Sequence, residues 1–83
     1  MNREHLLFHL GEALEELSRT KDQCQKDIDY SEGELFLAMQ HLYHHLNTAW
    51  NGRSLSPDRV AQSIDQDFNT LGAFPSDIPP LSA

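Results

Sequence analysis

Residues 31–53 read SEGELFLAMQHLYHHLNTAWNGR, and this stretch decides the fold because it contains both ends of a long helix. Ser31 and Glu34 have the spacing of a capping box. In that motif the serine hydroxyl accepts a hydrogen bond from the backbone N–H three residues on, and the glutamate carboxylate accepts one from the N–H of the serine. Asn51-Gly52 tolerates the left-handed backbone that ends many helices. The sequence therefore predicts a helix over residues 32–51.

One face of this helix is apolar. Its apolar residues recur at intervals of four and three, which places them on one side of a spiral with about 3.6 residues per turn. They are Leu35, Met39, Leu42, Leu46 and Ala49. Another element must cover this face, because apolar side chains aligned on one helix stabilise it chiefly by packing.

Residues 2–27 predict a second long helix, since they contain no proline and only one glycine. Two interleaved seven-residue series of mainly apolar residues form a continuous seam along it. Only a few residues separate the two helices, and short connections produce antiparallel neighbours. We therefore expect a helical hairpin in which the two apolar seams face each other, with Leu14 opposite Leu46. The two series are Leu7, Leu14, Lys21 and Ile28, and Leu10, Leu17 and Cys24.

A third, shorter helix is predicted over residues 57–71. Ser56-Pro57-Asp58 combines a serine cap, a proline at the first helical position and an acid in the first turn. The prolines of residues 73–83 remove backbone donors and favour extended geometry, so this segment is predicted to be an extended proline-rich tail. The expected fold class is all-α, with one helical domain over residues 1–72; the sequence does not decide whether the tail is ordered.

The length of the chain favours self-association. A chain of 83 residues forms one domain and buries only about 60 to 65 % of its unfolded surface. A helix of about 25 residues is about 37 Å long, whereas a compact domain of this size has a radius of gyration of about 12 Å. The hairpin should therefore be elongated, and two hairpins pairing into a four-helix core would cover apolar surface that one copy exposes. We predict a homodimer.

The charge balance excludes some partners. The chain has six Lys and Arg against thirteen Asp and Glu, for a net charge of −7. Because no basic stripe is present, binding to nucleic acid or to an anionic membrane is disfavoured. No apolar run reaches the roughly 18 residues of a membrane span. Cys24 is the single cysteine, which excludes a disulfide within the chain and fits a reducing compartment, so we expect a cytoplasmic protein.

Five histidines are the main candidates for chemistry. His41 and His45 lie one helical turn apart, as do His5 and His9, and imidazoles at this spacing can share a metal ion. The predicted seam places His5 and His9 on the outer face, whereas His41 and His45 flank the apolar stripe. His41 and His45 are thus the predicted divalent-metal ligands. A structural hydrogen-bonding role and a pH-responsive contact remain as alternatives for these two side chains.

The segment around these histidines is also the best candidate for binding a protein partner, because it combines polar and aromatic side chains. No nucleophile in a suitable context and no glycine-rich phosphate loop is present, so no catalytic residue is predicted. The sequence favours a small acidic helical protein that acts through protein–protein interaction without catalysis. The alternative is a helical protein, either an enzyme or a binding protein, that binds a metal or small ligand around His41 and His45. The interaction candidates are Tyr43, His44, Trp50 and Arg53.

Overall fold

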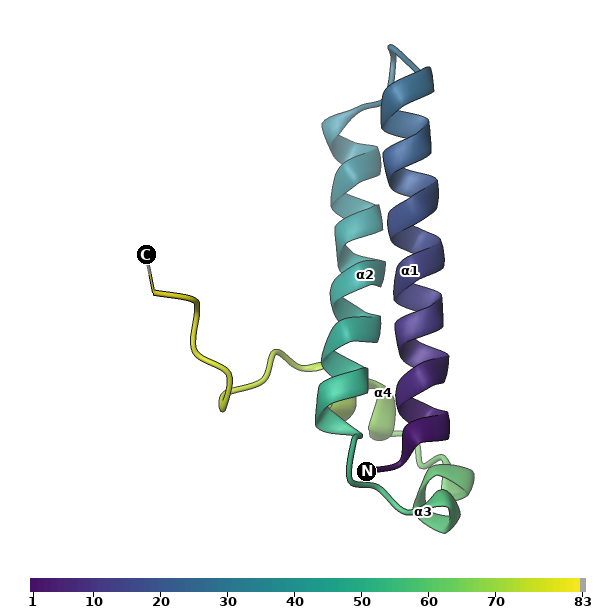
Figure 1. The fold of residues 1–83 in the computed structure, drawn as a ribbon, viewed down its shortest axis with the longest axis vertical. Helices are drawn as coiled ribbons and strands as arrows, with labels where there is room; N and C mark the ends of the chain where they lie inside the picture. The colour runs from purple at the N-terminus through teal and green to yellow at the C-terminus, as the bar shows by residue number, and fades with distance from the viewer. Residues whose placement is uncertain (83) are drawn as a thin grey trace.

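The structure is a computed structural model that describes residues 1–82, and within them it is entirely helical, without a β-strand. The two long helices α1 and α2 pack against each other as an antiparallel hairpin (Figure 1). The short helices α3 and α4 lie at the open end of the hairpin. The all-α class with two long packed helices is therefore confirmed. The four helices are α1 (Arg3–Lys26), α2 (Glu32–Asn51), α3 (Pro57–Gln62) and α4 (Asp67–Gly72).

Side chains cap the N-termini of both long helices. The Asn2 side chain accepts a hydrogen bond from the backbone N–H of His5, and the Ser31 hydroxyl accepts one from the backbone N–H of Glu34. The Glu34 carboxylate accepts from the Ser31 hydroxyl at 3.2 Å rather than from its backbone N–H, so the capping box forms with one altered bond. These caps satisfy donors that the first turn of a helix leaves free.

The interior of the hairpin differs from the prediction. The leucine seam does not face α2: Leu14 is 64 % exposed and Leu46 is 40 % exposed. The prediction that the two leucine seams bury each other is therefore wrong. Leu14 lies about 100° round the helix from Ala13, which is buried, because each residue advances a helix by that angle. Small and polar side chains fill the contact between the long helices; the buried residues are Ala13, Glu16 and Thr20 of α1 and Asn47, Thr48 and Ala49 of α2.

The predicted third helix over residues 57–71 is divided into α3 and α4. Ser63 adopts a left-handed backbone with φ of 45°, which ends α3. The Asp67 carboxylate then accepts from the backbone N–H of Ile64 at 3.1 Å, and it also accepts two hydrogen bonds from Arg59 at 3.0 and 2.6 Å. The bond from Ile64 closes the turn before α4, and the bonds from Arg59 tie α4 to α3.

Helix α4 is held against α2 by asparagine side chains. Asn47 donates to the carbonyl of Gly72 at 3.0 Å, and Asn51 donates to the carbonyls of Leu71 and Ala73, both at 2.7 Å. The last carbonyls of a helix have no partner within that helix. The asparagines therefore cap the C-terminus of α4 and fix its position at the same time.

Residues 73–82 contain no helix and leave the hairpin along one side of α2 (Figure 1). The ring of Phe74 contacts that of Tyr43 edge-on, with centroids 5.2 Å apart. The indole N–H of Trp50 donates to Asp77 at 2.9 Å, so the first half of the segment is attached to α2. The predicted tail also includes residue 83, which lies outside the described residues.

Two glycines allow a matched test of this packing. A β-carbon at Gly11 would meet no atom within 4 Å, whereas one at Gly52 would overlap Nε2 of His5 and lie 3.0 Å from the carbonyl oxygen of Thr48. We expect Gly11→Ala to stabilise the protein by about 0.5–1 kcal/mol through helix propensity. Gly52→Ala should lower the melting temperature, measured by circular dichroism. A Gly52→Ala protein as stable as the Gly11→Ala protein would contradict the contact between His5 and α2.

Candidate functional site

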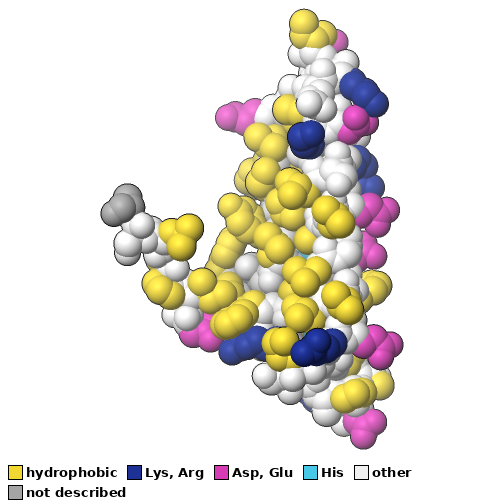
Figure 2. Space-filling view, viewed as in Figure 1, with side chains coloured by type: hydrophobic (Ala, Val, Ile, Leu, Met, Phe, Trp, Pro, Cys, Tyr) yellow, Lys and Arg dark blue, Asp and Glu magenta, His cyan; other side chains and the backbone are white. Residues whose placement is uncertain are grey.

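One side of the hairpin presents an apolar surface formed by both long helices, here called the leucine face. Leu7 and Leu14 are 66 % and 64 % exposed although they repeat regularly along α1. Apolar side chains form a continuous band down the front of the hairpin in Figure 2. The leucine face consists of the exposed Leu7, Leu10, Leu14 and Leu17 of α1 and Leu46 of α2, together with the half-buried Leu35, Met39 and Leu42 of α2.

The leucine face is prominent because the chain buries little apolar material elsewhere. Among the described residues, Ala13 and Ala49 are the buried hydrophobic residues, and no large side chain is fully buried. Monomeric proteins rarely expose continuous apolar patches larger than a few hundred Å², and larger patches usually mark binding surfaces. The leucine face therefore has the composition of a hydrophobic core that lacks a covering partner.

The histidines gather between the long helices and on the side away from the leucine face. Ring centroids are 4.7 Å apart for His5 and His9, 5.4 Å for His9 and His45, and 5.4 Å for His44 and His45. The prediction that His9 lies on the outer face is wrong, because the true contact surface of α1 centres on Ala13 rather than on the leucines. Nδ1 of His9 lies 3.1 Å from Nδ1 of His45 across the hairpin.

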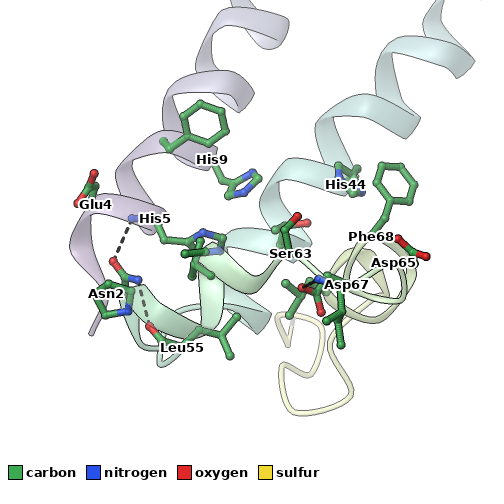
Figure 3. A pocket seen from close by; sticks show the side chains of 17 residues that line it. Asn2, Glu4, His5, His9, His44, Leu55, Ser63, Asp65, Asp67 and Phe68 are labelled. Atoms are coloured by element: carbon green, nitrogen blue, oxygen red, sulfur yellow. Dashed lines mark hydrogen bonds between the residues drawn. The ribbon is translucent and has the colours of Figure 1, made fainter.

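A cleft of about 760 Å³ separates this side of the hairpin from α3, α4 and the residues that join them. Figure 3 shows His5, His9 and His44 on the hairpin wall and Phe68 with Asp67 on the opposite wall. The His44 ring stacks on Phe68 with centroids 4.3 Å apart. The cleft has the size of many small-molecule sites, and its walls combine imidazoles with apolar side chains.

His9 and His44 are held in their neutral form in the cleft. Partial burial, together with the nearby His5, His45 and His44, lowers the pKa of His9 to about 4. Burial, together with His45 and His41, also lowers the pKa of His44. Desolvation and neighbouring positive charge both disfavour an imidazolium ion. At neutral pH these rings are therefore uncharged and able to accept hydrogen bonds or coordinate metals.

The predicted metal pair is not oriented toward a common partner. The side chain of His41 is 73 % exposed, and its Nδ1 lies 3.7 Å from the Glu16 carboxylate, which also pairs with Arg19. His45 instead faces His9. Over residues 1–82, no group of three or more His, Cys, Asp or Glu side chains is placed to hold a metal ion. The pairing of His41 with His45 stays a prediction.

The predicted interaction residues are engaged within the chain. The guanidinium of Arg53 lies 3.7 Å from the ring centroid of Trp50, and both side chains contact Asp77. Tyr43 packs on Phe74, and His44 stacks on Phe68. These residues thus attach the C-terminal segment and α4 to α2. Phe68 and His9 line the cleft but were not predicted as site residues from the sequence. For His9, the spacing of one helical turn from His5 was the pattern that could have indicated a site.

No protein-family model, curated protein or solved structure matches this chain. None of the helices in the described part of the chain is long and apolar enough to cross a membrane.

The lowered pKa of His9 predicts a loss of stability in acid. The folded chain takes up a proton at His9 near pH 4, whereas the unfolded chain does so near the ordinary value of 6.5. Protonation therefore favours the unfolded state as the pH falls from 7 toward 4. The groups facing His9 are His5 of its own helix and His44 and His45 of α2.

We expect the melting temperature to fall between pH 7 and pH 5 and the His9→Asn variant to show a smaller fall. Asp67 and Asp77 stay ionised over this range, because hydrogen bonds from Arg59 and Trp50 respectively lower their pKa values. His41→Asn serves as the control, since His41 is largely exposed. Equal pH dependence in the wild type and the His9→Asn protein would contradict the environment described for His9.

Proposed function

We propose that this chain is a non-enzymatic helical interaction protein whose leucine face pairs with that of a second copy to form a four-helix bundle. The observation that supports this is that Leu7, Leu10, Leu14, Leu17 and Leu46 are each at least 40 % exposed on the hairpin. Two hairpins with their apolar sides together would place these side chains in a common core, as in other four-helix bundles.

The dimensions of the leucine face suit a second copy. Helix α1 contains 24 residues and is about 36 Å long, and two adjacent helices are about 20 Å wide. The face therefore measures about 700 Å², close to the roughly 800 Å² that each partner contributes to a standard interface. A surface formed by two antiparallel helices can match a copy of itself about a twofold axis, which is the commonest symmetry of oligomers.

The distribution of charge also permits pairing. The net charge of −7 would make two copies repel each other. In Figure 2, however, the Asp and Glu side chains lie at the margins of the leucine face rather than on it. Charges at a rim remain in water, where salt screens them over about 8–10 Å. The repulsion between copies is therefore small beside the gain from burying the leucines.

The outer surface of such a bundle would be acidic and would be available to a protein partner. The unpaired, exposed thiol of Cys24 supports a location in a reducing compartment such as the cytoplasm. Because the large apolar side chains would become buried only on pairing, folding and assembly would be coupled.

The leucine face can be tested by comparing a double leucine variant with a control substitution at the position next to one of the two leucines. We expect the wild type to have twice the mass of the chain by light scattering at tens of micromolar, and its melting temperature to rise with concentration. Leu7→Gln with Leu14→Gln should give a monomer with a lower melting temperature. Glu15→Gln, one residue from Leu14 but off the leucine face, should leave the dimer intact.

A wild type that is monomeric at these concentrations, with a melting temperature independent of concentration, would refute the proposal. Equal dimerisation of the double-leucine variant and the Glu15→Gln control would also refute it, because the interface would then lie elsewhere.

A further inference from the structure

The contact between His9 and His45 has the geometry of two ligands of one metal ion. Their Nδ1 atoms lie 3.1 Å apart and come from different helices. Imidazole nitrogens bind zinc at about 2.0–2.1 Å, so two of them on one ion lie about 2.9–3.4 Å apart for bond angles between 90° and the tetrahedral value. The two nitrogens therefore already have the separation of two ligands on one ion.

The hydrogen bond between the two rings also bears on metal binding. A metal ion requires a free nitrogen lone pair, and protons compete with it. In the free protein one Nδ1 donates a hydrogen bond to the other, so the pair holds one proton between the two atoms. An ion bound to both nitrogens would displace that proton onto Nε2 or into solvent.

The surroundings indicate which ion would bind. His9 lines the cleft, whereas His45 does not. No third His, Cys, Asp or Glu among residues 1–82 completes a set of three, which leaves the other coordination positions to water. Nitrogen ligands favour late first-row ions over Mg²⁺ and Ca²⁺, with affinity highest for Cu²⁺.

We propose that His9 and His45 form a two-histidine site for Cu²⁺, Ni²⁺ or Zn²⁺ whose remaining coordination positions are filled by water. This site pairs His45 with a residue of α1 instead of with His41 of its own helix. It lies within one chain and does not depend on pairing of the leucine face. The ion would join α1 to α2 and bind only the folded hairpin, because the two histidines are far apart in the unfolded chain.

Thermal unfolding with and without Ni²⁺ or Zn²⁺ tests the site. At a saturating concentration of either ion we expect the melting temperature of the wild type to rise by about 5 °C or more, and EDTA to reverse the rise. His9→Asn and His45→Asn should each abolish it. His41→Asn should keep it, since the His41 side chain points to Glu16 and solvent.

A second measurement keeps the test valid if a histidine variant folds poorly. In ¹⁵N NMR of the wild-type protein, one equivalent of Zn²⁺ should shift the Nδ1 resonances of His9 and His45 and leave that of His41 unchanged. No thermal shift with either ion would overturn the proposal. A shift lost in His41→Asn but retained in His9→Asn would also overturn it, and would place the ion on α2 alone.

Discussion

The close contact between α1 and α2 is the constraint on which the rest of the structure depends. It is made by alanine, threonine and polar side chains, and Ala13 and Ala49 are nearly inaccessible to solvent. Small side chains let two helices approach closely, whereas leucines would hold them apart. Because these residues occupy the contact, the leucines of both helices point to one flank of the hairpin and the histidines are brought together.

The hairpin thus has two sides of different character. The leucine face has few charges and is suited to pairing with another apolar surface. The opposite side is covered in part by α4, which Asn47 and Asn51 fasten to α2. That attachment places Phe68 on His44 and forms one wall of the cleft. Assembly and ligand binding would therefore use separate surfaces, and one could change without disturbing the other.

Local signals in the sequence were sufficient to predict where helices α2 and α3 begin. The caps at Ser31 and Ser56 depend on side chains within three residues of the bonds that they make, and both form. The periodicity of the leucines indicated which side chains share a face. It could not indicate what that face meets, because both an intramolecular and an intermolecular core produce the same pattern. The position of His9 was misjudged for the same reason.

The other misses come from contacts between distant residues. The pairing of Arg59 with Asp67 bridges α3 and α4 across eight residues, and the docking of α4 depends on asparagine amides 20 or more residues away. The attachment of the C-terminal segment at Trp50 has a practical consequence. This indole is the single tryptophan of the chain, with a cation over its ring and a carboxylate at its N–H. Its fluorescence is therefore an intrinsic optical reporter of whether that segment is attached.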